Sequence, residues 1–266
     1  MKYYFIAGTL FLFVLGGSIN MALAQEKGKR YLGIKGGLSI PNLSAGGSAQ
    51  TELNTGYSSA TGTDFAIFYE VKHSSRLSFS TQLEYCTEGG KKNGFQALPT
   101  PDALAPYFTG QQRAVPSLVY ADYNCKAKMN YLLLSEMAKY RLPLAKSSPL
   151  SFYAEAGPFV GLLLSAHQVT SGQSNIYADK TQQENITEIS GAGEQSLEND
   201  QNIRNQLHKF NFGIEGDIGF AYTIRRSKIF IEGGGNYGFL NIQKGTANGK
   251  NRIGAGIVRM GYALEL

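Results

Sequence analysis

The sequence contains no tryptophan and only 2 cysteines, and charged residues make up 17% of its 266 positions. That charged fraction is low for a soluble domain, in which about 25% is usual. The cysteine count and the length exclude a disulfide-scaffold mini-protein. Collagen-like and disordered chains are excluded as well, because the 32 glycines follow no triplet period and 42% of residues are hydrophobic. The length allows one large domain or two small ones.

Long apolar runs are also missing, apart from a short one at the start of the chain. The segment Phe5–Leu15 is almost continuously apolar, follows the positive Lys2 and precedes the A-x-A sequence Ala22–Ala24. This pattern predicts a secretory signal peptide over residues 1–24, cleaved after Ala24, and a mature domain over residues 25–266. An uncleaved anchor is the alternative, but the run is shorter than the ~20 residues that span a bilayer.

Alternation of apolar and polar residues is the main pattern after the signal peptide. Between Phe210 and Tyr222, large apolar side chains fall on one face, and small or charged side chains fall on the other. A period of two is that of a β-strand whose two faces differ. Eight segments show it: Tyr31–Ile40, Phe65–Lys72, Leu77–Tyr85, Lys128–Arg141, Phe152–Leu164, Phe210–Tyr222, Lys228–Phe239 and Arg252–Leu266.

The connections between these segments alternate in length. Short ones cover His73–Arg76, Leu142–Pro149 and Arg225–Ser227, and long ones run roughly over 41–61, 87–124, 166–208 and 240–251. Alternating segments joined in this way are typical of an outer-membrane β-barrel. We therefore predict an all-β fold, an eight-stranded antiparallel transmembrane β-barrel. Its chain ends and short turns are expected on the periplasmic side, and its long loops outside.

A soluble β-sandwich also alternates apolar and polar residues, so the contents of the two faces decide between the folds. In this chain, charges and small residues share one face of nearly every segment, as in a barrel with lipid outside and a narrow polar interior. Tyrosines of the other face supply an aromatic girdle near the segment ends: Tyr85, Tyr140, Tyr222, Tyr237 and Tyr262. With the signal peptide, these features predict a location in the bacterial outer membrane, in contact with its lipid.

Several of these segments carry recognisable motifs. They are Gly33-Ile-Lys-Gly-Gly-Leu-Ser39, Leu83-Glu-Tyr85 followed by Glu88-Gly-Gly-Lys91, Asn130-Tyr-Leu-Leu-Leu134 with Ala138-Lys-Tyr140, and Ala156-Gly-Pro-Phe-Val-Gly-Leu-Leu163. In this order and spacing, they resemble the PorT-like outer-membrane β-barrel domain, a porin-family domain of Bacteroidetes, over essentially all of residues 30–266. The resemblance implies the fold and the location. The association of PorT itself with protein secretion does not follow from likeness at the level of the domain.

One motif departs from that family. Where the family usually has an acidic residue followed by Ile-Pro, this chain has Leu133-Leu-Ser135. Glu136 then falls on the face expected to meet lipid. This placement predicts a bulge or register change in the segment Lys128–Arg141.

Charges of both signs fall on the face expected to line the lumen. They are Lys35, Glu70, Lys72, Glu84, Lys139, Arg141, Glu155, Glu215, Asp217, Glu232 and Arg259. The interior of an eight-stranded barrel is just wide enough to be filled by side chains, and an unpaired charge buried there is costly. We therefore predict a salt-bridged polar plug that closes the lumen. An ion-conducting pathway is the alternative.

Catalytic and metal-binding patterns are weak. The three histidines are His73, His167 and His208, and the last two fall at the ends of one long connection. They can be interpreted as a metal-binding pair at the barrel rim, and His167 with Ser165 and an acidic residue as a hydrolytic triad. Without a supporting cysteine or carboxylate motif, solvated loop residues are the better interpretation. We expect no enzyme activity, no metal and no cofactor.

The 2 cysteines, Cys86 and Cys125, flank the second long connection. Both fall on the lumen face, and export to an oxidising compartment favours pairing of an even number of thiols. We predict a disulfide between them that clamps this connection over the barrel mouth. Two free buried thiols are the alternative.

The long connections differ in composition, and this difference bears on function. Residues 87–124 combine prolines with aromatics, which predicts a packed cap, whereas residues 166–208 are polar and acidic, which predicts a flexible loop. We expect a monomeric barrel with a structural or interaction role, which displays its loops or anchors a protein partner through them. A small pore or ligand-carrying protein is the alternative, and a lipid-modifying enzyme is a more distant one. No nucleic-acid partner is expected, because the protein is predicted to be exported and its lysines and arginines are dispersed.

Overall fold

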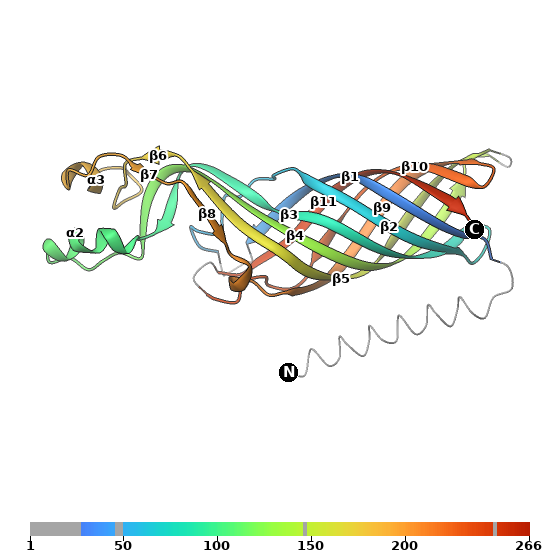
Figure 1. Ribbon diagram of the computed structural model, residues 1–266, viewed down its shortest axis with the longest axis horizontal. Helices are drawn as coiled ribbons and strands as arrows, with labels where there is room; N and C mark the ends of the chain where they lie inside the picture. The colour runs from blue at the N-terminus through green and yellow to red at the C-terminus, as the bar shows by residue number, and fades with distance from the viewer. Residues whose placement is uncertain (1–27, 46–49, 146–147, 247–248) are drawn as a thin grey trace, which may run out of the picture.

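Eight strands close into a ring in a computed structural model that describes residues 28–45, 50–145, 148–246 and 249–266 (Figure 1). The ring strands are β1 (Arg30–Ala45), β2 (Gly62–Lys72), β3 (Leu77–Pro99), β4 (Leu118–Pro143), β5 (Leu150–Ser171), β9 (Phe210–Ile224), β10 (Ser227–Gly238) and β11 (Asn251–Glu265). Each pairs antiparallel with the next ring strand, and β11 returns to pair with β1. The predicted eight-stranded barrel is confirmed, and within the ring each strand is paired on both sides.

The two ends of the ring differ. At the turn end, short turns join β2 to β3, β4 to β5 and β9 to β10, and the first and last strands meet with Tyr31 opposite Glu265. At the loop end, the longer connections leave the ring (Figure 1). The predicted signal peptide, residues 1–24, lies outside the described residues.

The largest departure from the predicted strands is in β3 and β4. Their pairing continues past the ring to Pro99 opposite Leu118, where the sequence predicts a loop over residues 87–124. The 3-10 helix η2 (Asp102–Leu104) and the short helix α2 (Ala105–Gly110) close the tip of this hairpin. Because prolines and aromatics interrupt the pattern here, the alternation is harder to detect than in the ring.

The connection after β5 is folded as well, although the sequence predicts a flexible loop there. It contains β6 (Gln173–Ser174), α3 (Ile186–Ile189), β7 (Gln195–Ser196), β8 (Asn199–Asn202) and the 3-10 helix η3 (Arg204–Gln206). β6 pairs with β7, and β8 pairs with β5. None of the helices within the described residues is long and apolar enough to cross a membrane.

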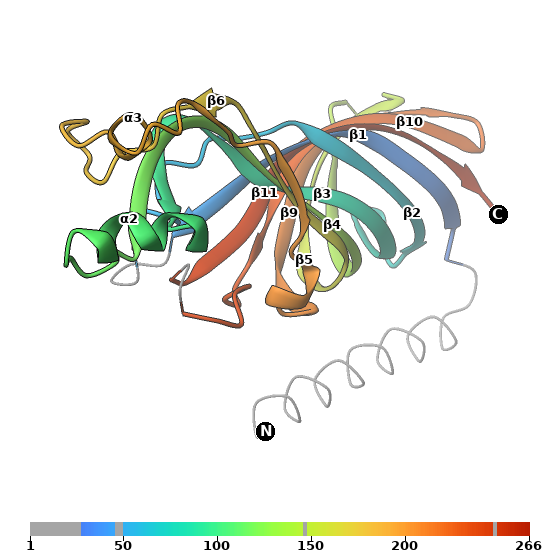
Figure 2. The same ribbon diagram turned by 60° about the vertical axis from the view of Figure 1, so that its left-hand side comes forward.

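The β3–β4 hairpin and the β5–β9 connection pack together into what we call the extension, residues 88–129 and 172–198. Its apolar core consists of Phe108, Val119, Ala121, Tyr123, Cys125, Ile176 and Ile186. Figures 1 and 2 show the extension projecting from the loop end of the ring. The chain therefore builds a second, smaller core beyond the barrel.

Large apolar side chains cover the outside of the ring. They include Ile34, Leu38, Phe65, Ile67, Phe212, Ile214, Ile218, Phe220, Ile229, Ile231, Val258 and Met260, together with Tyr140, Tyr222, Tyr237 and Tyr262 of the predicted girdle. A continuous apolar surface of this kind is unfavourable in water and suits a lipid environment.

Glu136 lies on this outer face, and the register change predicted for its segment lies six residues before it. The inward residues of β4 alternate without interruption as far as Lys139, and the Glu136 carboxylate accepts a 2.8 Å hydrogen bond from the Thr81 hydroxyl of β3. The register between β4 and β5 shifts at Asn130, opposite which Leu164 is the extra residue. The predicted register change in the segment Lys128–Arg141 is therefore confirmed, and the extra residue that causes it belongs to β5.

Candidate functional site

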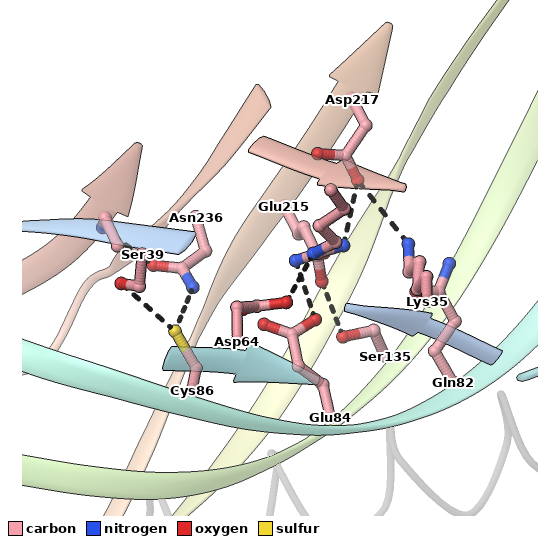
Figure 3. Close-up of polar contacts among 12 residues, drawn as sticks. Lys35, Ser39, Asp64, Gln82, Glu84, Cys86, Ser135, Glu215, Asp217 and Asn236 are labelled. Carbon is pink, nitrogen blue, oxygen red and sulfur yellow. Dashed lines mark hydrogen bonds and ion pairs between the residues drawn. The ribbon is translucent and has the colours of Figure 1, made fainter. Parts of the chain in front are cut away.

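Arg259 is the centre of a buried charge cluster in the lumen. Its side chain reaches five carboxylates: Asp64 at 2.6 Å, Glu84 at 2.9 Å, Glu215 at 3.0 Å, Glu232 at 3.3 Å and Asp217 at 3.6 Å. These acids come from β2, β3, β9 and β10, and Figure 3 shows four of their carboxyl groups converging. Arg259 is 1% exposed, so its charge is balanced inside the protein rather than by water.

Two glycines provide the room that this cluster needs. Gly37 lies directly opposite Arg259, and a Cβ atom on it would be 1.9 Å from the Val258 carbonyl oxygen. Gly234 lies opposite Asp217, and a Cβ atom on it would be 2.2 Å from a carboxylate oxygen of Asp217. A larger residue at either position would push the backbone or the carboxylate away.

Lys35 and Lys139 extend the cluster towards the turn end. The Lys35 Nζ atom is 2.7 Å from Glu232 Oε1 and 3.3 Å from Glu155 Oε1. Lys139 Nζ is 2.8 Å from the other Glu155 oxygen, and the Tyr153 hydroxyl donates a 2.7 Å hydrogen bond to Glu232. Because Glu155 and Glu232 are each shared between two cations, the charges form one network rather than separate pairs.

Aromatic rings and a second acid close the network at the turn end. Glu70 accepts from Lys139 at 3.2 Å and from Lys228 at 3.0 Å. Lys139 Nζ lies 4.6 Å from the centre of the Tyr153 ring, and Lys228 Nζ lies 3.3 Å from that of Tyr31. The cavity among these side chains has a volume of about 20 Å³, which is room for about one water molecule.

The structure brings nine of the charges assigned to the lumen together inside the ring: Lys35, Glu70, Glu84, Lys139, Glu155, Glu215, Asp217, Glu232 and Arg259. Lys72 and Arg141 are half-buried at the turn end. Sequence reasoning missed Asp64 and Lys228, which contact Arg259 and Glu70. Each stands at the edge of a predicted strand. Continuing the alternation one residue back from Phe65 would have identified Asp64.

An apolar layer separates the charge network from the loop end. Next to the network, Cys86 donates to the Ser39 hydroxyl at 3.7 Å and accepts from Asn236 at 3.8 Å (Figure 3). The layer beyond it includes Leu43, Met129, Tyr131, Leu133, Leu163, Ile203, Leu207, Ile242 and Ile253, all buried. On the side that faces the loops, the charges around Arg259 are therefore covered by a mainly apolar layer, which also holds the buried carboxyl group of Glu88 opposite Met129.

The predicted disulfide between Cys86 and Cys125 is wrong. Both thiols are free and buried, and in the β3–β4 register Cys86 lies opposite Tyr131 whereas Cys125 lies opposite Lys92. The offset of six positions corresponds to about 20 Å along the strands, whereas a disulfide needs Cα atoms within about 7 Å. The prediction treated residues 87–124 as a loop, which placed the two cysteines at the same level.

A cavity of about 240 Å³ lies where the extension meets the ring. Tyr57, Tyr123 and Cys125 line it, and the Tyr57 hydroxyl lies 4.0 Å from the Cys125 sulfur. Five of its lining residues also belong to the apolar layer: Leu43, Met129, Ile203, Leu207 and Ile242. The apolar layer therefore forms the floor of the cavity and lies between the cavity and the charged part of the lumen.

Two groups of lumen side chains are compact enough to surround a metal ion. They are Asp64 with Glu84 and Cys86, and Glu155 with Asp217 and Glu232. Arg259 already contacts the two acids of the first group, and Lys35 contacts all three acids of the second. Protein cations thus hold the positions that an ion would need.

The histidines do not assemble the triad considered from the sequence. His167 Nδ1 is 3.0 Å from Asp200 Oδ1, and both side chains are exposed. The Ser165 hydroxyl instead accepts a 2.8 Å hydrogen bond from Asn130 on β4. His167 and Asp200 therefore form an ordinary surface pair.

Similar solved structures include Neisserial surface protein A, which is 12% identical with a TM-score of 0.40 over 90% of this chain and 100% of that one. The attachment invasion locus protein Ail of Yersinia pestis is 10% identical, with a TM-score of 0.36 over 90% and 100% of the two chains. OprG of Pseudomonas aeruginosa is 10% identical, with a TM-score of 0.39 over 91% and 97%.

Sequence comparison is more informative than these distant structural likenesses. No curated protein matches the sequence. The model of one protein family, described as outer membrane protein beta-barrel domain, matches residues 23–244, which include most of the ring and the whole extension. The chain therefore belongs to the outer membrane protein beta-barrel domain family.

Proposed function

We propose that this protein is a sealed barrel that holds its extension outside the cell, with a structural or interaction role. Its family is located in the bacterial outer membrane, and the apolar outer face of the ring suits lipid. The termini and short turns share one end, which we assign to the periplasm, so the extension lies outside. In this orientation, the barrel is the anchor and the extension is the displayed part.

The layered filling of the lumen supports this proposal most strongly. The network around Arg259 occupies the middle of the ring, an aromatic group with Phe68, Tyr153 and Phe230 lies towards the turn end, and the apolar layer lies towards the loop end. An ion would have to cross hydrocarbon and displace interlocked salt bridges. The stacking of these layers favours an anchor over a pore.

The proposal is tested by conductance measurements on the purified protein in planar bilayers. We expect no steady conductance, with a general porin as the positive control for insertion. Folding of the inserted material is checked by its SDS-gel mobility, which changes on boiling for folded barrels. Reproducible open channels from folded protein would contradict a sealed lumen.

Several further properties belong to the same proposal. The motifs quoted above favour a PorT-like member of the family, exported by a signal peptide that is cleaved after Ala24. The single closed ring is complete without a second subunit, which supports a monomer. A protein partner would be contacted through the extension, since that part is folded around its own core and projects from the loop end of the ring.

A ligand-carrying role is the second candidate, and the cavity beneath the extension is the observation that favours it. The cavity lies on the loop side of the apolar layer, which forms its floor. Ligand binding there is therefore compatible with a sealed lumen.

A further inference from the structure

We infer that the cavity between the ring and the extension is a binding site for a neutral sugar residue. The inference deepens the proposed display function, because it rests on the extension lying outside the cell, and it names the ligand class that the displayed part would hold. The volume of about 240 Å³ is below the about 300–1,000 Å³ of pockets for drug-sized ligands. A cavity of this size fits a ligand of one ring or one short chain.

The charge of the lining restricts the ligand class. Among its described lining residues there is no aspartate, glutamate, lysine or arginine. A free amino acid, a dipeptide or an acidic sugar would bring charges into a partly buried site that offers no partner for them, which is costly. A neutral ligand is therefore favoured.

The polar groups of the lining exclude a purely apolar ligand. Six carboxamide side chains line the cavity: Gln96, Gln168, Gln201, Gln206, Gln243 and Asn251. Within the described part of the chain, Gln206 and Gln243 form hydrogen bonds only through main-chain atoms, and Gln201 pairs only in the β5–β8 ladder, so their side-chain amides have no partner in the protein. A hydrocarbon ligand would displace water from these amides without forming hydrogen bonds to them, which is unfavourable.

Carboxamides and aromatic rings together match a sugar. The carboxamides of Gln201, Gln206 and Gln243 each offer two donors and one acceptor oxygen, which pair with hydroxyl groups that both donate and accept. Tyr57 and Tyr123 add amphipathic rings, against which the C–H face of a pyranose can pack. Gln201 and Gln206 are exposed at the surface, so a ligand can reach the cavity from solvent.

Cys125 provides a reporter inside the cavity. Its thiol lies beside Tyr57, and burial raises the pKa of this thiol, so its alkylation is slow and sensitive to a ligand that blocks it. The other thiol, Cys86, is fully buried in the lumen and can be removed by Cys86→Ala. The remaining single thiol then reports on the cavity alone.

The test measures the rate of Cys125 alkylation by iodoacetamide in the Cys86→Ala protein, by mass spectrometry. The protein is held in an amine-oxide detergent, because detergents with sugar headgroups would compete. The probes are glucose, galactose and N-acetylglucosamine, with glucuronic acid and dialanine as charged controls. At about twice the Kd of a bound sugar, we expect alkylation to slow by about threefold, and we expect no slowing with either charged control.

Matched variants connect the protection to the lining. Gln206→Ala, inside the cavity, is expected to abolish protection by the sugar, whereas Gln183→Ala, an exposed glutamine of the extension outside the cavity, leaves it unchanged. Saturation-transfer NMR with the same probes gives a second readout, which decides the outcome if the thiol proves inaccessible to the reagent. Both variants are checked for folding by SDS-gel mobility.

The inference would be overturned if none of the three neutral sugars binds, or if the charged controls bind equally well. A barrel that conducts no ions and binds no sugar would contradict this inference and leave the proposed anchor function intact. A conducting barrel would contradict the anchor function, whatever the sugars do.

Discussion

Arg259 in the lumen and Arg113 in the extension both pair with carboxylates, but in opposite surroundings. Arg259 is 1% exposed and contacts five acids from four strands. Arg113 is exposed and forms one forked pair with Glu184, with Nη2 3.1 Å from Oε2. In the lumen, every charge needs its partners because water is absent, whereas water replaces either partner in the extension.

The two regions also differ in what holds them together. The middle of the lumen is filled mainly by polar and charged side chains, and lipid rather than water meets its apolar outer face. The extension is an ordinary water-soluble structure with a small apolar core around Phe108 and Ile186. The ring therefore has a polar interior and an apolar exterior, whereas the extension has an apolar interior and faces water. A charged residue stabilises the ring only when its partners are buried with it, and in the extension it can be solvated by water.

The largest expected effect comes from removing the central cation. Arg259→Met leaves Asp64, Glu84 and Glu215 buried without their main partner, so the free energy of unfolding of the barrel should fall by about 3–5 kcal/mol. The measurement is urea unfolding of the protein in lipid vesicles, followed by SDS-gel mobility. Arg113→Met is the matched control and should leave barrel unfolding unchanged. Equal effects of the two substitutions would contradict the contrast drawn between the regions.

A smaller, local effect is expected from the core of the extension. Phe108 is 1% exposed, and Phe108→Ala should destabilise the extension by about 3 kcal/mol through the cavity it leaves. Proteolysis of residues 100–115 on intact cells should accelerate, while the barrel keeps its urea midpoint. Val115→Ala, at an exposed position nearby, serves as the control. Loss of barrel stability in Phe108→Ala would show that the two cores are not independent.

The smallest effect concerns acid conditions. The Arg113 hydrogen bonds hold the pKa of Glu184 below its ordinary value of 4.5, and the Thr181 hydroxyl with backbone N–H groups lowers the pKa of Asp179 to about 2. Carboxyls with lowered pKa values stabilise the folded state above their ordinary pKa and lose this contribution as pH falls through the lowered one. The extension should therefore loosen slightly below about pH 4.5.

Hydrogen exchange of residues 105–113 and 179–189, corrected for intrinsic rates, measures this loosening. Glu184→Gln should remove part of the pH dependence, because its amide does not titrate. Protection that increases towards low pH would contradict the assignment.

The sequence predicted the ring well because strands facing lipid on one side and a narrow lumen on the other keep a strict period of two. The alternation of apolar and polar residues over Phe210–Tyr222 predicts that Glu215 and Asp217 point inward, and the structure has them there. The extension could not be predicted in this way. Its hairpin faces water, and its core joins Phe108 to Ile186, which are far apart in the sequence. No local pattern reports such a contact.

The cavity between the ring and the extension could not be predicted from the sequence for a related reason. The glutamines that line the cavity come from β3, β5 and two separate connections, and they share neither a motif nor a spacing. The error over Cys86 and Cys125 has the same origin. Both depend on how far β3 and β4 continue past the ring, and this length is determined by contacts with a connection more than 50 residues further along the chain.

The position of Arg259 on β11 has a consequence for assembly. β11 follows the other ring strands in the sequence and joins β1 to complete the ring. In a partly built ring without β11, acids from β2, β3, β9 and β10 would face one another without the guanidinium that holds them together. Their mutual repulsion opposes any partly built ring, and full neutralisation is available only after closure. We therefore expect pairing of β11 with β1 and neutralisation of these acids to occur together, which makes closure of the ring cooperative.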